Sequence, residues 1–157
     1  MHKTNAVRIL DKHNIKYELV EYAVDEEDLS AQNVAAKLEQ NIKQVFKTIV
    51  IKGDKSGIFA AVVPGDSEID LKKAAKAAGN KSAEMIAVKD LMKITGYIRG
   101  GCSPLAMKKD YPVYLEESAL NFNFIYISAG VRGMQIKLAT RDLIAVSKIS
   151  VCTLING

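Results

Sequence analysis

The sequence predicts a single α/β domain with a mixed, barrel-like β-sheet of about seven strands and four or five flanking helices. Residues 45–52 and 58–63 are rich in apolar side chains and are separated by the turn 53–57, which predicts a hairpin in the centre of the sheet. Helix-like and strand-like segments alternate irregularly, unlike a regular βαβ repeat. A chain of 157 residues can bury one hydrophobic core without stabilising disulfide bonds or metal sites, so one domain, 1–157, is expected.

Three of the expected helices begin with residues that commonly cap a helix. Thr4 precedes a segment whose apolar residues share one helical face. Ser30 follows the acidic run 25–28, which is expected to be a solvated loop, and Asp70 precedes a helix that Gly79 should stop. Shorter helical segments are expected at 88–95, at 116–120 and at 140–146, where Thr140 is the expected cap.

Strands are expected wherever apolar residues run continuously or alternate between turn signals. In chain order, these segments are 17–22, 45–52, 58–63, 83–87, 112–115, 124–128 and 134–139, with 149–154 as a last candidate.

Composition excludes several classes of protein. The net charge of +4 and a pI of about 9.0 permit an anionic partner such as nucleic acid. The two cysteines, Cys102 and Cys152, form no CxxC motif and no Cys/His cluster, so no metal and no other cofactor are expected. The N-terminus lacks an apolar signal core and no run is long enough to span a membrane, which predicts a cytoplasmic protein with reduced thiols.

A glycine-rich loop over residues 96–109 is the first candidate site. Gly100-Gly101 followed by Cys102, Ser103 and Pro104 cannot continue a helix or lie in a central strand. Glycines let backbone N–H groups approach a ligand closely, although an ordinary surface turn explains the loop equally well. Cys102 is a possible nucleophile, but no partner base is visible, so the favoured interpretation is an inert small residue.

Lys47 and Ser128 are the other candidates. Lys47 shares a strand face with Ile49 and Ile51, where an ammonium is costly unless it is paired or faces a pocket. It either extends from the strand's end to solvent or binds an anion or a carbonyl oxygen. Ser128 ends an apolar strand that runs into Gly130, as at the border of a pocket or in a hairpin turn. Arg132 in that turn either binds phosphate or is solvated.

The two histidines argue against a His-dependent mechanism. His2 lies at the terminus and His13 at the end of a helix or packed on one of its faces, and neither is near a serine, cysteine or aspartate in a recognisable arrangement. The HExxH, P-loop and GxGxxG motifs are also absent from the sequence.

Four motifs in order resemble one family. They are Phe46-Lys47-Thr48, Asp70-Leu71-Lys72-Lys73, Gly96-Tyr97 with 100–104, and 126–130 with Arg132-Gly133. Together they closely resemble the YbaK/EbsC family of aminoacyl-tRNA deacylases, relatives of the editing domain of bacterial prolyl-tRNA synthetase. The resemblance extends from Thr4 to about Ser147. It implies a free-standing enzyme that hydrolyses misacylated tRNA, typically Cys-tRNA(Pro), on a mixed, barrel-like β fold with flanking helices.

The resemblance also implies roles for individual residues. Lys47, Tyr22, Gly101 and Ser128 correspond to the family's catalytic positions. The substrate-binding positions implied are Gly100, Cys102, Ser103, Gly130, Arg132 and Gln135. Gln135 stands where some members have aspartate, which leaves the amino-acid specificity open. Ala106 replaces a glycine found in many members, which could stiffen the loop.

The family's chemistry needs neither a metal nor a histidine base. In Cys-specific members the substrate's own thiol attacks the ester and leaves as a cyclic thiolactone, while the protein supplies position and electrostatics. On this view Gly101 and its neighbours donate N–H groups to the carbonyl oxygen. Lys47 holds the terminal phosphate or ribose, and Tyr22 and Ser128 shape the pocket.

The expected partners are misacylated tRNA and, as an open possibility, prolyl-tRNA synthetase. Binding of tRNA should be mainly electrostatic, with candidate contacts at Lys72, Lys73, Lys76, Arg99, Lys108, Lys109 and Arg132. Three alternatives remain: a deacylase for another amino acid such as alanine, a non-catalytic module that binds tRNA or a synthetase, and a small-molecule binder.

Overall fold

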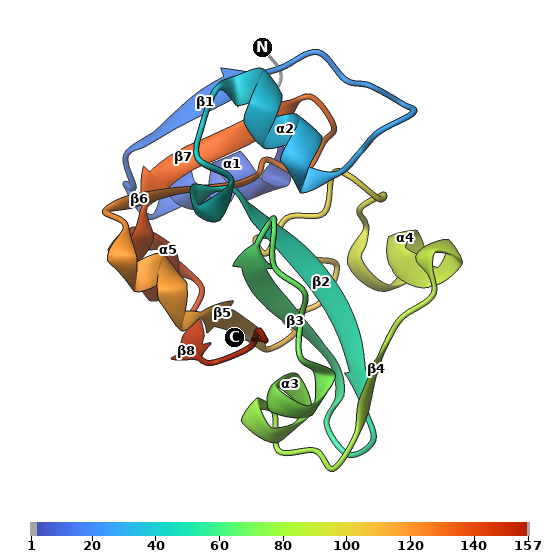
Figure 1. Ribbon diagram of the computed structural model, residues 1–157. Helices are drawn as coiled ribbons and strands as arrows, with labels where there is room; N and C mark the ends of the chain where they lie inside the picture. The colour runs from blue at the N-terminus through green and yellow to red at the C-terminus, as the bar shows by residue number, and fades with distance from the viewer. Residues whose placement is uncertain (1–2, 157) are drawn as a thin grey trace.

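The computed structural model describes residues 3–156, and His2 lies outside the described residues. Figure 1 shows the elements, which alternate irregularly as the sequence predicts. The α-helices are α1 (Asn5–Lys12), α2 (Ala31–Leu38), α3 (Leu71–Ala77), α4 (Leu91–Thr95) and α5 (Thr140–Val146). Three short 3₁₀ helices are η1 (Ile42–Gln44), η2 (Val88–Asp90) and η3 (Glu117–Asn121). The strands are β1 (Tyr17–Glu21), β2 (Phe46–Gly53), β3 (Gly57–Pro64), β4 (Ala83–Met85), β5 (Val113–Glu116), β6 (Phe124–Ser128), β7 (Met134–Ala139) and β8 (Ser150–Cys152).

The helix caps follow the sequence at three positions and differ at a fourth. The side chains of Thr4, Ser30 and Asp70 accept hydrogen bonds from backbone N–H groups in the first turns of α1, α2 and α3. Thr140 is not a cap, because it is the first helical residue of α5. Its N–H donates to Asn123 O and its hydroxyl to Phe122 O, so tertiary contacts to the segment before β6 override the capping preference.

The strands form the expected mixed β structure as two open sheets in the described residues, so the barrel-like detail of the prediction is not confirmed. One sheet has the order β1-β7-β6, and the other has the order β4-β2-β3-β5-β8 with the predicted hairpin near its centre. The sheets meet at an isolated bridge between Val45 and Tyr126. The Gln44 side chain donates to Phe124 O at 2.9 Å, which adds a second contact at this junction.

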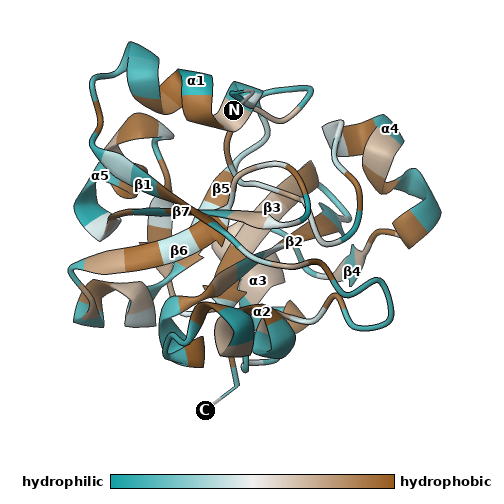
Figure 2. Ribbon diagram, turned by 90° about the horizontal axis from the view of Figure 1, so that it is seen from above, coloured by the Kyte–Doolittle hydropathy of each residue, from teal (hydrophilic) through white to brown (hydrophobic). Residues whose placement is uncertain are grey.

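The smaller sheet lies between two helices, α1 on one face and α2 on the other (Figures 1 and 2). Ile125 and Ile127 of β6 are buried in one core cluster with Val7 and Leu10 of α1. Tyr126, which points to the opposite face, packs with Val34 of α2. The face toward α2 therefore also carries Ser128, two positions after Tyr126, at the end of the strand.

The larger sheet is also covered on both faces. Ala60 and Val62 of β3 belong to the cluster that contains α1, whereas Phe59, Ala61 and Val63 pack in a second cluster with Ala74 of α3. Figure 2 shows the strands of this sheet in mainly apolar colours and the outer turns of the helices in polar ones. The near-continuous apolar sequence of 58–63 reflects this double burial.

Candidate active site

A cavity of about 440 Å³ collects residues from six separate parts of the chain. Its walls are the loop before α2 with the first half of that helix, the first half of β2, Gly65 after β3, the glycine loop, Ser128 of β6 and Gln135 of β7. A second cavity of about 430 Å³ lies between η3 and α5 and holds none of the predicted site residues. The first cavity is therefore the candidate active site.

Lys47 supplies a cation to this cavity. It lies near the start of β2 and is half-buried, and its Nζ donates to the carbonyl oxygen of Gly65 at 3.3 Å. Burial lowers the pKa of Lys47 below its usual value, and the carboxylates of Asp66 and Glu68 partly oppose that shift. One carbonyl uses only one of the three donors of an ammonium, so Lys47 can still bind an oxygen of a ligand.

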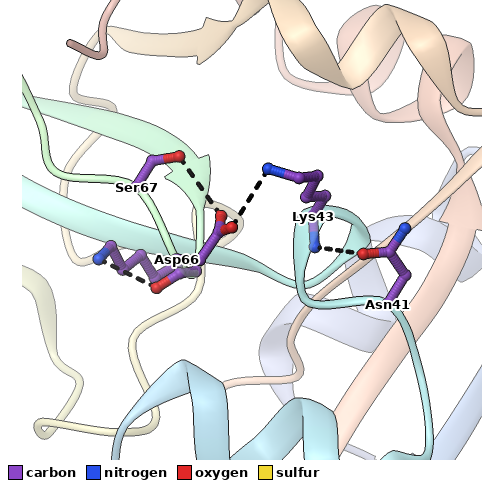
Figure 3. Close-up of polar contacts among 6 residues, drawn as sticks. Asn41, Lys43, Asp66 and Ser67 are labelled. Atoms are coloured by element: carbon purple, nitrogen blue, oxygen red, sulfur yellow. Dashed lines mark hydrogen bonds and ion pairs between the residues drawn. The ribbon is translucent and has the colours of Figure 1, made fainter. Parts of the chain in front are cut away.

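The nearby carboxylate of Asp66 has other partners. It accepts a hydrogen bond from Lys43 Nζ at 3.3 Å and one from the Ser67 hydroxyl at 3.4 Å, as Figure 3 shows. The Lys43 contact is an ion pair whose lysine side chain is largely exposed, so it holds Asp66 weakly. No direct hydrogen bond joins Asp66 to Lys47 within the described residues, and its effect on Lys47 is through space.

Ser128 and Gln135 face each other across β6 and β7 and are both buried. The Ser128 hydroxyl accepts a hydrogen bond from the N–H of Gly130 at 3.1 Å. The Gln135 side chain is 5% exposed, and its Oε1 has no hydrogen-bond partner in residues 3–156. A buried amide oxygen without a partner is costly, so it is a natural position for a donor on a ligand.

Gly100 and Cys102 of the glycine loop line the cavity, but Gly101 does not. The N–H of Gly101 donates to Ile98 O at 2.9 Å, so in this conformation it is engaged within its own loop. A Cβ at Gly101 would lie 3.2 Å from backbone atoms of Val131 and Arg132. Glycine is needed here because two loops pack backbone against backbone.

Cys102 is a poor nucleophile in this position. Burial raises the pKa of its thiol to about 11, so the reactive thiolate is scarce near neutral pH. The interpretation of Cys102 as a small wall residue therefore has a physical basis.

Three further predicted residues lie behind the cavity wall. Tyr22 packs on the apolar cluster of Val34, Ala35, Val45 and Tyr126, two of which line the cavity. Ser103 is fully buried, and its hydroxyl accepts from the N–H of Leu105, which shapes the turn. Gly130 has a positive φ of 100°, and a Cβ there would lie 3.0 Å from the Tyr97 ring.

Arg132 also lies outside the cavity lining, and its guanidinium is already engaged. Its Nε donates to Arg99 O at 2.8 Å, and its Nη1 donates to Glu26 Oε2 at 2.7 Å. The expected role of Arg132 as a direct substrate contact therefore lacks support from this geometry.

Comparison with known proteins identifies the family. The family model described as "Aminoacyl-tRNA editing domain" matches residues 25–146, which contain every residue of the cavity. A protein of Enterococcus faecalis, named "Putative Cys-tRNA(Pro)/Cys-tRNA(Cys) deacylase EbsC", is 50% identical over 145 residues, 92% of this chain and 88% of the relative. The chain belongs to the aminoacyl-tRNA editing domain family.

Other editing-domain relatives are more distant. A segment of 79 residues, half of this chain and 14% of the relative, is 32% identical to a proline–tRNA ligase of Fervidobacterium nodosum. A solved structure titled "Crystal structure of a putative trans-editing enzyme for prolyl tRNA synthetase" superposes with a TM-score of 0.83 over the whole of both chains. At 22% identity this likeness supports the fold alone.

The editing-domain cavity contains residues that the sequence did not point to. Glu27, Asp28 and Leu29 form one wall, although the acidic run was expected to be only a solvated loop. A Cβ at Gly65 would lie 2.5 Å from the Ala31 side chain, so this glycine allows α2 to approach β3 closely. The Pro64-Gly65 pair marks a turn, and nothing in it indicates that α2 will pack on it.

Within residues 3–156, no group of three or more His, Cys, Asp or Glu side chains is placed to hold a metal ion. In the same range no helix has both the length and the apolar character required to cross a membrane.

Proposed function

We propose that this chain removes wrongly attached amino acids from tRNA in trans, with Cys-tRNA(Pro) as its main substrate. The observation that carries the proposal is the Lys47 ammonium. It lines the cavity of an aminoacyl-tRNA editing domain and uses only one of its donors, on Gly65 O. The name of the relative that is 50% identical supports the choice of cysteine and of tRNA(Pro).

In this proposal Lys47 binds an oxygen of the terminal ribose-phosphate or of the ester. An ammonium in a partly desolvated position attracts such an oxygen more strongly than an exposed one. The N–H groups of Gly100 and Cys102 make no hydrogen bond to another residue within 3–156, so they can take the donor role first expected of Gly101. Gln135 Oε1 can accept from a donor on the aminoacyl group, and Ser128 shapes the wall beside it.

The chemical step we propose uses the substrate's thiol as the nucleophile. The cysteine sulfur bonds to the ester carbonyl carbon, the bond from that carbon to the tRNA oxygen breaks, and the thiol proton ends on the released tRNA hydroxyl. The products are a four-membered thiolactone, which water opens to cysteine, and uncharged tRNA. The attack is intramolecular, so the protein contributes orientation and stabilisation of the developing oxyanion. Among the described residues, none of those that line the cavity is a histidine, which suits a step without a protein base.

The decisive experiment compares tRNA(Pro) carrying cysteine, S-methylcysteine, alanine or proline. We expect fast release of cysteine and release of the other three near the rate of the uncatalysed reaction. Equal rates for cysteine and S-methylcysteine would reject the thiol as nucleophile, and equal rates for cysteine and alanine would indicate a broader deacylase. Binding of tRNA without release of any amino acid would instead identify a non-catalytic module.

Two further parts of the proposal concern the setting of the reaction. A cytoplasmic location and direct contact with prolyl-tRNA synthetase are predictions. The predicted contact is tested by adding prolyl-tRNA synthetase to the deacylation reaction. If the synthetase binds this chain, the KM for tRNA should fall. An unchanged KM at saturating synthetase would show that the chain acts alone.

A further inference from the structure

Two loops that are far apart in the sequence form neighbouring parts of the cavity wall. Glu27, Asp28 and Leu29 belong to the acidic loop, residues 25–29, and Arg99 and Gly100 belong to the glycine loop. The positions of these two loops set the shape of this part of the cavity. The contacts that hold the two loops together therefore bear directly on substrate binding.

Arg132 joins the two loops without lining the cavity. Its Nε donates to Arg99 O in the glycine loop at 2.8 Å, and its Nη1 donates to Glu26 Oε2 in the acidic loop at 2.7 Å. In residues 3–156 no hydrogen bond or ion pair connects these loops directly. The other side-chain bonds to this part of the chain come from α2, where Asn33 donates to Asp28 O and Lys37 to Ala23 O.

The packing around Gly100 places the same three segments in contact. Gly100 has a positive φ of 83°, and a Cβ there would lie 3.4 Å from Arg132 Nε and 3.5 Å from Leu29 Cβ. The turn that carries Arg132 is itself fixed at the site, because Ser128 precedes it and Gln135 follows it in the cavity wall. The turn also holds the chain just before the acidic loop, since Gly133 O accepts from Tyr22 N at 2.9 Å.

From these contacts we infer that Arg132 is a positioning residue for the proposed deacylation. Its planar guanidinium presents donors in two directions and so fixes the distance between the acidic loop and the glycine loop. The pair with Glu26 is exposed on the glutamate side, where 71% of the side chain is accessible, so it adds little to global stability. Its effect is on the shape of the cavity where these two loops meet, and hence on KM. The inference rests on the proposed function for this readout.

The alternative role for Arg132 is contact with a tRNA phosphate. Substitution of Glu26 distinguishes this role from the positioning role. If Arg132 joins the loops, Glu26→Ala removes one of its anchors and lowers kcat/KM by about two- to fivefold. If Arg132 binds phosphate, Glu26→Ala frees the guanidinium and removes a negative charge near the tRNA, so binding becomes tighter. Glu18→Ala is the matched control, because Glu18 is also an exposed glutamate paired with a cation, Lys137 at 4.0 Å.

The experiment measures steady-state deacylation of Cys-tRNA(Pro) by wild type, Glu26→Ala, Arg132→Ala, Arg132→Lys and the double alanine variant. We expect about a tenfold rise in KM for Arg132→Ala with kcat little changed, because two hydrogen bonds are lost. In Arg132→Lys the KM should stay close to that of Arg132→Ala, since an ammonium cannot reproduce the two directed donors of the guanidinium. The double variant should match Arg132→Ala alone. The slope of log KM against log salt should stay at the wild-type value, whereas loss of a phosphate contact would lower it by about 1.

Hydrogen exchange supplies a readout that does not depend on activity. Arg132→Ala should speed amide exchange in both 25–29 and 98–101, and Glu18→Ala should speed it in neither. Tighter tRNA binding by Glu26→Ala, a reduced salt slope for Arg132→Ala, or unchanged exchange in both loops would overturn the inference. A wild-type protein that deacylates no tRNA would refute the proposed function, and the exchange experiment would then decide the role of Arg132 by itself.

Discussion

The ammonium nitrogen of Lys47 lies 3.3 Å from the carbonyl oxygen of Gly65, and both residues line the same cavity. This contact directs the lysine from the start of β2 toward the turn that ends β3. The register pairs Lys47 with Val63, two residues before Gly65, so the hairpin itself brings the donor and the acceptor together. The strand pairing thus places the cation of the site.

Substitution of Gly65 by alanine should damage both the fold and the cavity. The added Cβ would lie 2.5 Å from Ala31 Cβ, 2.8 Å from Ile42 Cδ1 and 3.0 Å from Val45 O. We expect a loss of about 1–3 kcal/mol in the free energy of unfolding and a fall in kcat/KM, because α2 has to move away from β3. Chemical denaturation and deacylation assays measure the two effects.

Gly57→Ala provides the matched control for Gly65→Ala. Gly57 has a positive φ of 75° at the hairpin tip, and a Cβ there meets nothing within 4 Å. This variant should lose about 1–2 kcal/mol through backbone strain while kcat/KM stays at the wild-type level. Equal losses of kcat/KM in both variants would show that Gly65 affects the site only through global stability.

Gln135→Leu should make the protein no less stable and yet less active. Leucine fills a similar volume and removes a buried amide whose Oε1 has no partner in the described residues, so the free energy of unfolding should stay level or rise. The lost acceptor should reduce kcat/KM for Cys-tRNA(Pro) by about tenfold. Thermal unfolding tests the predicted stability of Gln135→Leu, and single-turnover deacylation tests its predicted activity. Full activity in this variant would exclude the amide from substrate binding.

Cys102→Ala should retain most of the wild-type activity. Burial disfavours the charged thiolate and so raises the pKa of Cys102 to about 11, which means that about one thiol in a thousand is ionised at pH 8. Iodoacetamide should therefore modify Cys102 slowly at pH 8, with a rate that rises about tenfold for each pH unit below the pKa. Rapid alkylation at pH 7, or an inactive Cys102→Ala, would assign the thiol a chemical role.

Much of the fold follows from the sequence because local and tertiary preferences agree. Residues 124–128 form β6 as predicted, and Thr4, Ser30 and Asp70 cap their helices. The division into two sheets was not predictable, since the strand patterns do not show that the sheets meet at an isolated bridge, Val45 with Tyr126, beside the bond from the Gln44 side chain. Sequence patterns predict which face of a strand a residue occupies, but they do not predict which strands pair edge to edge.

The site was only partly predictable for a similar reason. Lys47, Ser128 and Gln135 lie on strands, so their placement follows from strand period and pairing. Gly101 and Arg132 lie in loops, where the direction of an N–H or a guanidinium depends on contacts with other loops. The acidic wall at 27–29 could not be foreseen, because a charged run is usually a solvated surface.

The alkaline limit of activity should report on Lys47. Burial disfavours the ammonium and lowers the pKa of Lys47, so its charge is lost at a lower pH than that of an ordinary lysine. Catalysis that needs this charge should therefore fall on the alkaline side below pH 10.5, after subtraction of spontaneous ester hydrolysis. In Lys47→Arg, any residual activity should persist to higher pH, because guanidinium stays protonated.

The measurement that tests the central claim most directly is single-turnover deacylation of Cys-tRNA(Pro) by wild type and by Lys47→Ala, with thermal unfolding of both. The account predicts rapid release of cysteine by wild type, a loss of about 100-fold or more in Lys47→Ala, and closely similar unfolding temperatures. Equal rates for the two folded proteins, or no release above the uncatalysed rate by wild type, would contradict it.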